Sequence, residues 1–179
     1  MKSKNSNKKI NITKHGIISS LYFNAIFRNI IKLIDVKKKV KVLDFGCGYG
    51  YLKKKLKRNK KIKVINYDII KELTEIDDWK NANFDYFVCC HVFVYLKKKK
   101  IEKIIKYIKK NHPKAKIIVA ITKQGWLNKI GAFILNEPNA HLNLHLTSSE
   151  EIFIFSKYMR VIKKMNILFL TDVYLLEFI

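Results

Sequence analysis

Four residues in one short segment have the types and the spacing to hold a nucleotide-like ligand. Gly46, Gly48 and Gly50 alternate with other residues directly after Asp44, in the run VLDFGCGYG. Glycine adopts positive φ at little cost and has no Cβ, so such a loop lets the backbone approach a ligand closely. A helix that begins behind the loop would offer free backbone amides to an anionic group. A second acid, Asp68, follows at roughly the spacing that suits hydrogen bonds to ribose hydroxyls, about 20 residues further on.

These residues need a strand before the loop and a helix behind it. Residues 40–45 are rich in Val, Leu and Phe and predict a strand that ends at the first acid. Leu52 and Leu56 lie four positions apart, which predicts a helix with one apolar side. Residues 63–67 predict a second strand that ends next to Asp68. Strand, glycine loop, helix and strand is the order of a nucleotide-binding α/β unit.

The rest of the chain continues this alternation. Residues 84–90 and 116–122 are almost uninterrupted apolar runs, which are typical of strands buried on both faces of a parallel sheet. Helical spacing of apolar residues predicts helices over 17–34 and 101–111. The predicted fold class is therefore α/β, with a Rossmann-like, doubly wound and mostly parallel sheet. Residues 160–179 predict a C-terminal antiparallel hairpin.

Two further segments precede that hairpin. Thr147 and Glu150 have the spacing of a capping box, which predicts a helix that begins there and continues through Met159. Residues 125–135 form an apolar, aromatic segment around Trp126. This segment could be a lid, a membrane-contacting helix or a plain core helix.

The glycine segment resembles the first motif of the class I S-adenosylmethionine-dependent methyltransferases, an acid followed by x-G-x-G-x-G. Residues 84–96, FDYFVCCHVFVYL, are similar to the fourth strand and its exit in the small-molecule, type 11/12-like branch of that family. HLTSSEEI, residues 145–152, is similar to the segment before the family's last helix. A dinucleotide-binding protein would show GxGxxG instead, which needs glycine at the position of Tyr51.

The resemblance implies a methyltransferase that moves the methyl group of S-adenosylmethionine to an O, N or C atom of a small or lipid-like molecule. It also implies which residues contact the cofactor: Asp44, Gly46, Cys47, Gly48, Tyr49, Gly50, Asp68, Ile69 and His91. Tyr49 could shield the cofactor or simply pack. The candidates for removing a proton from the acceptor are His91, His141 and His145. His91 could equally be a hydrogen-bond partner of the substrate or a structural residue.

The segment between Asp68 and Phe84 is shorter than the resembled family requires. The family places a helix, a third strand and an adenine-contacting acidic loop there. We therefore expect the third edge strand to be missing or short. Ile69 is the expected apolar contact to the adenine face, with Asp77, Asp78 or Trp79 as alternatives.

The chain carries a formal net charge of +23, which by itself would suggest a nucleic acid or an anionic membrane as partner. Only Arg28, Arg58 and Arg160 are arginine, however, and nucleic-acid sites favour the bidentate fork of that side chain. The lysine runs belong to helices that a doubly wound fold places on opposite faces of the sheet. A solvated coat is thus favoured, and an RNA methyltransferase or a non-catalytic cofactor-binding or membrane-surface module is the alternative.

Cysteine and histidine patterns exclude some further classes of site. Cys47, Cys89 and Cys90 form neither a disulfide framework nor a CxxC metal pair, which indicates a reducing, cytoplasmic setting. HLNLH lacks the glutamate of HExxH, so no metal is expected. No uninterrupted apolar run reaches the roughly 18 residues of a membrane span, although peripheral membrane contact stays possible. We expect residues 1–14 to be a flexible basic tail and residues 15–179 to be a single methyltransferase domain.

Overall fold

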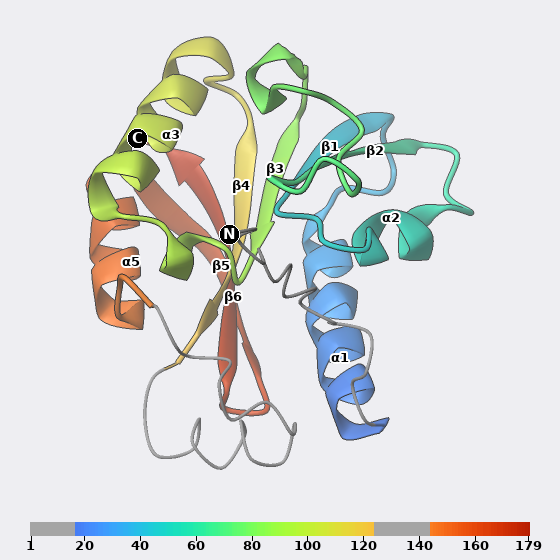
Figure 1. The fold of residues 1–179 in the computed structure, drawn as a ribbon, viewed down its shortest axis with the longest axis horizontal. Coiled ribbons are helices and arrows are strands. Elements are labelled where there is room, and N and C mark those ends of the chain that lie inside the picture. Colours follow the sequence, from blue (N-terminus) through green and yellow to red (C-terminus); the bar gives the residue numbers. More distant parts are fainter. Residues whose placement is uncertain (1–16, 124–143) are drawn as a thin grey trace, which may run out of the picture.

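The computed structural model describes residues 17–123 and 144–179, which contain one six-stranded sheet in the order β2-β1-β3-β4-β6-β5 (Figure 1). The strands β2, β1, β3 and β4 are parallel to one another, and β6 is antiparallel to both β4 and β5. This arrangement confirms the predicted Rossmann-like sheet with its antiparallel C-terminal hairpin. The strands are β1 (Val40–Phe45), β2 (Ile62–Tyr67), β3 (Tyr86–Cys90), β4 (Lys116–Thr122), β5 (Met159–Ile167) and β6 (Thr171–Phe178).

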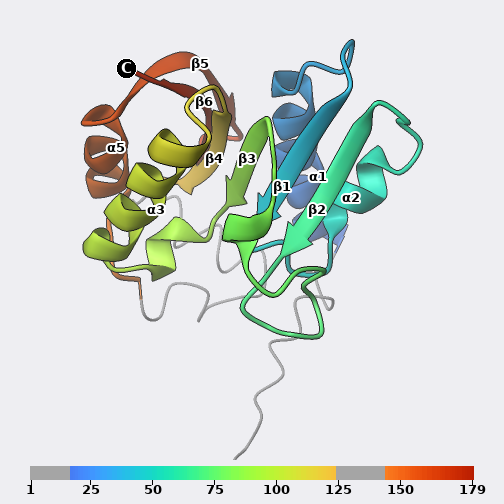
Figure 2. The same cartoon turned by 90° about the horizontal axis from the view of Figure 1, so that it is seen from above.

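Helices cover both faces of the sheet, as Figure 2 shows from above. On one face, α1 (Ile17–Leu33) packs its apolar side on β4, β5 and β6, and α2 (Tyr51–Leu56) packs on β2. On the other face lie α3 (Lys98–Asn111) and α5 (Ser148–Ser156). The lysines of α2 and of α3 therefore lie on opposite faces, as predicted, because each helix turns its charged side away from the sheet.

The alternation of side chains along β1 divides the core into two halves. Val40 and Val42 point into the half formed with α1 and α2, whereas Leu43 and Phe45 point into the half formed with α3 and α5. All four are buried, as expected for a central strand of a doubly wound sheet. The same alternation places Asp44 on the α1 and α2 side, at the carboxyl end of the strand.

The third edge strand is absent, as the short segment predicted, and β2 forms the edge of the sheet. Between β2 and β3 the chain forms a loop with one short 3-10 helix, Trp79–Asn81. Glu75 covers the carboxyl end of the free edge, because its backbone N–H donates to the Asn66 carbonyl at 3.0 Å and its carboxylate accepts from the Asn66 N–H at 3.1 Å. Trp79, an alternative adenine contact from the sequence, is instead buried against Phe45 and Phe87.

The C-terminal third departs from the sequence prediction at one boundary. The Thr147 and Glu150 capping box forms as predicted, but α5 ends at Ser156 and does not reach Met159. Met159 instead begins β5 and pairs with Phe178 of β6. This pairing makes it a strand residue, although its spacing also fits the helix. The turn of the hairpin lies at residues 168–170.

Some predictions fall elsewhere in the chain. The basic segment 1–14, the apolar segment 125–135 and His141 lie outside the described residues. Within residues 17–123 and 144–179, none of the helices has the length and apolar character needed to cross a bilayer.

Candidate functional site

The glycine loop forms a tight connection at the carboxyl ends of β1 and β2. Gly46, Gly48 and Gly50 all have positive φ, at 75°, 50° and 68°. The N–H groups of Gly46 and Cys47 both donate to the Tyr67 carbonyl, at 2.8 and 3.1 Å, and so attach the loop to the end of β2. A Cβ on Gly46 would lie 2.2 Å from a methyl group of Val92, so a larger residue fits only if the Val92 side chain moves.

Gly48 provides the open side of this loop. A Cβ built on it would meet no atom within 4 Å, so solvent or a ligand can approach the backbone there. Its N–H donates to one carboxylate oxygen of Asp68 at 2.9 Å. The loop therefore presents exposed backbone directly beside the second acid.

Asp68 is half-buried, and both of its carboxylate oxygens accept backbone hydrogen bonds. One accepts from Gly48 and the other accepts from the Ile70 N–H at 3.1 Å. Each oxygen has a further lone pair, so the carboxylate can still accept from hydroxyl groups such as those of a ribose. The next residue, Ile69, is 84% exposed, which is unusual for so apolar a side chain and places it beside the acid with no cover.

Asp44 is the unusual group of the site, because it is only 2% exposed at the end of a central strand. Burial, together with the nearby negative charge of Asp68, raises the pKa of its carboxyl group to about 7. No group of residues 17–123 and 144–179 donates a hydrogen bond to this carboxylate. A buried carboxylate without a counter-charge is costly, and a cationic ligand group would relieve that cost.

Two predicted cofactor residues of the loop, Cys47 and Tyr49, differ in their surroundings. Cys47 is buried, and its thiol donates to the carbonyls of Gly48 and Leu73, both at 3.4 Å. Burial raises the pKa of this thiol to about 12, so it stays protonated and holds the loop rather than acting as a nucleophile. Tyr49 is half-buried at the open side of the loop.

His91 follows β3 and takes part in a hydrogen-bonded chain. Its Nε2 lies 3.2 Å from the hydroxyl of Thr171, and that hydroxyl lies 2.5 Å from the phenol oxygen of Tyr22. The imidazole also packs beside the rings of Tyr22 and Phe23, with centroid distances of 6.5 and 6.3 Å. His91 has a positive φ of 56°, so its backbone is held in a conformation that histidine seldom adopts.

Tyr22 and Thr171 were not identified from the sequence. They are separated by 149 positions, and each by itself has the pattern of an ordinary core residue of a helix or a strand. Burial raises the pKa of the Tyr22 phenol to about 12, so this hydroxyl stays protonated at neutral pH. The chain of hydroxyls therefore fixes the position of the imidazole without adding a charge.

Val92, the residue after His91, lies against Gly46 and so places the end of β3 beside the glycine loop. Burial raises the pKa of the Cys90 thiol, and the negative charge of Asp44 raises it further. Cys90 immediately precedes His91, and its charge contributes to the raised pKa of Tyr22. The structure thus brings Asp44, Asp68, the glycine loop and His91 to one edge of the sheet, where ligands bind in open α/β folds.

His145 belongs to the segment that leads into α5. It is exposed just before α5, and its backbone N–H donates to the Val94 carbonyl at 2.9 Å, which places it next to the segment that follows His91. Among the residues that the structure describes, no three His, Cys, Asp or Glu side chains are grouped as metal ligands would be.

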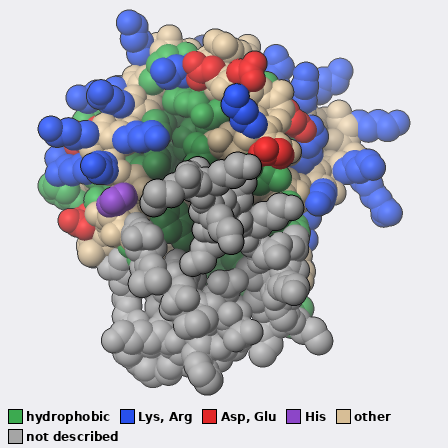
Figure 3. All heavy atoms as spheres, in the orientation of Figure 1, with side chains coloured by type: hydrophobic (Ala, Val, Ile, Leu, Met, Phe, Trp, Pro, Cys, Tyr) green, Lys and Arg blue, Asp and Glu red, His purple; other side chains and the backbone are tan. Residues whose placement is uncertain are grey.

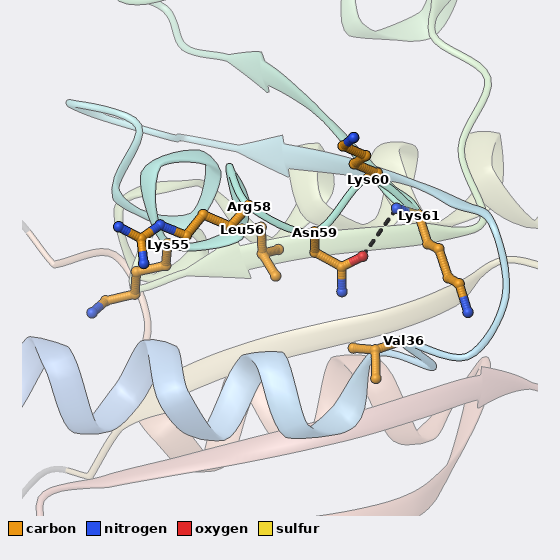
Figure 4. A pocket seen from close by; sticks show the side chains of 7 residues that line it. All are labelled: Val36, Lys55, Leu56, Arg58, Asn59, Lys60 and Lys61. Carbon is orange, nitrogen blue, oxygen red and sulfur yellow. Dashed lines mark hydrogen bonds between the residues drawn. The ribbon is translucent and has the colours of Figure 1, made fainter.

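A shallow surface groove lies at the opposite edge of the sheet. Val36 precedes β1 and Asn59 precedes β2, so the groove is at the amino ends of these strands, far from the glycine loop along each strand. Figure 4 shows the Asn59 side chain accepting from the Lys61 N–H, at 3.0 Å. The residues that line the groove are Val36, Lys55, Leu56, Arg58, Asn59, Lys60 and Lys61.

Positive side chains are spread widely over the surface. On the face shown in Figure 3, Lys and Arg side chains project on both flanks of a central apolar region. Of the described lysines, Lys53 pairs with Glu75, while Lys123 and Lys164 both pair with Asp172. This distribution agrees with a solvated coat better than with a single nucleic-acid groove.

Solved structures of methyltransferases share this fold. The Mitomycin 7-O-methyltransferase MmcR has a TM-score of 0.65 at 13% identity, over 90% of this chain and 55% of that one. Human N-acetylserotonin methyltransferase in complex with SAM has a TM-score of 0.64 at 15% identity, over 87% of this chain and 52% of that one. This chain therefore spans about half the length of these two enzymes.

A third structure, the PH0226 protein from Pyrococcus horikoshii OT3, matches over nearly its whole length. Its TM-score is 0.68 at 13% identity, and the match covers 92% of both chains. No protein-family model matches the sequence, and no curated protein is significantly similar to it. The chain thus has the Rossmann-like fold of the S-adenosylmethionine-dependent methyltransferases.

Proposed function

We propose that this protein is an S-adenosylmethionine-dependent methyltransferase that acts on a small or lipid-like molecule. The observation that carries the proposal is Asp44, a buried carboxylate that has no counter-charge among the described residues and lies beside an open glycine loop. S-adenosylmethionine carries a sulfonium and an ammonium group, and a buried anion at this edge of the sheet suits such a cation. Methyltransferases of known structure share the fold at low identity, which supports the assignment.

The proposed cofactor contacts divide the ligand among the site residues. Asp44 would face the cationic methionine part, while Gly46, Gly48 and Gly50 allow the backbone to approach it, next to Cys47 and Tyr49. Asp68 would accept the ribose hydroxyls, and the exposed Ile69 would cover the adenine. His91 would lie beside the methyl group, away from the adenine.

The reaction needs mainly positioning. S-adenosylmethionine supplies a methyl group that the sulfonium already activates for in-line displacement. The protein would hold the acceptor atom in line, which is the larger part of the rate gain in such reactions. His91, oriented by Thr171, would take the proton from the acceptor as the new bond to carbon forms. His145 and His141 are the other candidates for this proton transfer.

Calorimetric titration with S-adenosylmethionine tests the cofactor assignment. We expect saturable binding to the wild-type protein and loss of binding in Asp44→Ala and Gly46→Val. Asp85→Asn is the matched control, because Asp85 lies at the amino end of β3 and accepts a hydrogen bond from the Lys41 N–H, which asparagine can still do. The proposal is refuted if well-folded wild-type protein shows no heat of binding with S-adenosylmethionine.

The methyl acceptor can be sought with radiolabelled cofactor. Lysate fractions separated into lipid, RNA, protein and small-molecule pools are incubated with the enzyme and labelled S-adenosylmethionine. We expect label in the small-molecule or lipid pool.

We also place the reaction in the cytoplasm, because Cys47, Cys89 and Cys90 are free thiols.

RNA is the alternative acceptor, and the net charge of +23 favours it. Phosphate contacts would make RNA binding fall steeply with salt. Saturable RNA binding that persists near physiological salt, together with label in the RNA pool, would select this alternative.

A further inference from the structure

The turn between β5 and β6 is built in an unusual way. The Leu170 N–H donates to the Ile167 carbonyl at 3.0 Å, which closes a four-residue turn with Leu168 and Phe169 at its centre. Both central residues have positive φ, at 49° and 59°, as in a type I′ turn. Such positions favour Asn and Gly, and large apolar residues adopt them only at a cost.

Both side chains nevertheless point into solvent. Leu168 is 64% exposed and Phe169 is 73% exposed, so neither gains burial in return for its backbone strain. The turn is also firmly held, because the Asn166 side chain accepts from the Phe169 N–H at 3.1 Å and donates to Asp172 at 2.8 Å. The two apolar side chains are thus presented on a fixed support, which folding stability by itself does not explain.

The turn lies at the same edge of the sheet as the candidate site. Thr122, the last residue of β4, pairs with Thr171, the first residue of β6, so the turn projects beyond the carboxyl ends of the parallel strands. Thr171 contacts His91 and also Tyr22 of α1. Leu21, which precedes Tyr22 on α1, is a third exposed apolar side chain at this edge. Figure 1 shows the turn of the hairpin and the beginning of α1 at the same end of the molecule.

Positive charge surrounds the base of the turn. The amino groups of Lys123 and Lys164 lie 3.4 and 3.0 Å from the Asp172 carboxylate, so two positive charges meet one negative charge there. Lys163, which precedes Lys164 on β5, is also exposed. Together with the net charge of +23, this basic collar favours an anionic partner surface.

We propose that the Leu168 and Phe169 turn docks the protein onto an anionic lipid membrane. Protruding apolar side chains enter the boundary between headgroups and acyl chains, and lysines around them are attracted by anionic headgroups. Docking in this way turns the carboxyl edge of the sheet, with the candidate site, toward the bilayer. The inference does not depend on the proposed methyl transfer.

The test is the double variant Leu168→Asn/Phe169→Gly, which introduces the residues that a type I′ turn favours. Cosedimentation is measured with phosphatidylcholine vesicles that contain or lack phosphatidylglycerol. We expect the wild-type protein to bind only the anionic vesicles and the variant to bind them at least about 10-fold more weakly, since two apolar side chains no longer enter the bilayer. The variant should also melt about 4 °C higher, because the turn is relieved of strain. Loss of binding in a more stable protein cannot come from unfolding.

The matched control is Ile152→Gln/Phe153→Gln on α5, which removes an exposed apolar pair on the face of the sheet that α3 and α5 cover. We expect this control to bind vesicles as the wild-type protein does. The inference is overturned if the wild-type protein ignores anionic vesicles, if it binds neutral vesicles equally well, or if the turn variant binds like the wild type. A dimer that the turn variant disrupts in size-exclusion chromatography would overturn it in favour of self-association.

Discussion

Asp44→Asn should make the protein more stable and at the same time weaken its binding of the cofactor. The pKa of this carboxyl group is raised from 3.8 to about 7, chiefly by burial. At about 1.36 kcal/mol per pKa unit, this shift corresponds to a cost of about 4 kcal/mol for the ionised folded state. Asparagine has a similar shape and no charge, so it removes that cost.

The sign of the pH dependence follows from the raised pKa. Between pH 4 and pH 7 the folded protein keeps a proton on Asp44 that the unfolded chain has lost, so the free energy of unfolding falls as the pH rises through this range. The cost of the buried, ionised Asp44 is therefore complete above pH 7 and absent near pH 4. Asp44→Asn should therefore unfold with a free energy up to about 4 kcal/mol above the wild type at pH 8, and with little difference near pH 4.

Urea denaturation of both proteins at pH 4.5 and pH 8 measures this difference. Both experiments are done without cofactor, because binding would add its own stabilisation. If the gap between the variant and the wild type is the same at the two pH values, the carboxyl group does not titrate as its burial requires. The explanation of Asp44 as a charge kept for a cation would then fail.

Cofactor binding should show the opposite trend. A cationic ligand favours the ionised carboxylate, so wild-type binding should release a proton and strengthen as the pH rises from 6 to 8. Calorimetry in two buffers with different ionisation enthalpies counts that proton. Asp44→Asn should bind weakly, with no dependence on pH in this range.

The remaining predictions concern single contacts. Gly46→Ala should lower the free energy of unfolding by about 2 kcal/mol more than Gly48→Ala in urea titrations, because both have positive φ but only the former meets Val92. Glu151→Gln should stabilise the protein at pH 8 but not at pH 4, since burial raises the pKa of this carboxyl to about 7; equal melting shifts at both pH values would contradict this. Thr147→Ala should cost about 1 kcal/mol in thermal unfolding through loss of the capping box, whereas Thr147→Ser should cost little.

Local patterns were sufficient for most of the fold. The apolar runs of β3 and β4, the spacing of Ile101 to Ile108 in α3 and the glycine loop each have a signature within a few residues. The missing edge strand could also be predicted, because it is a matter of chain length. The end of α5 was misplaced because Met159 fits a helical spacing and a strand equally well, and only pairing with Phe178 decides between them.

The parts of the site that escaped prediction depend on long-range contacts. No local pattern relates Tyr22 to Thr171 and His91, since the three come from a helix, the first residue of β6 and the residue after β3. The burial of Glu151 depends on how α5 packs, and the sequence shows it simply as the second acid of a capping segment. The Leu168 and Phe169 turn was missed because a type I′ turn is recognised in a sequence by Asn and Gly, and this turn has neither.

The missing third strand has a consequence for how the protein would aggregate. The Glu75 carboxylate, which also pairs with Lys53, covers the end of β2 at Asn66, while β2 itself has no further strand beside it. Loss of that side chain would uncover the edge of β2 while the rest of the sheet persists, and an uncovered edge recruits other strands. Aggregation of a variant without this carboxylate should therefore begin at β2.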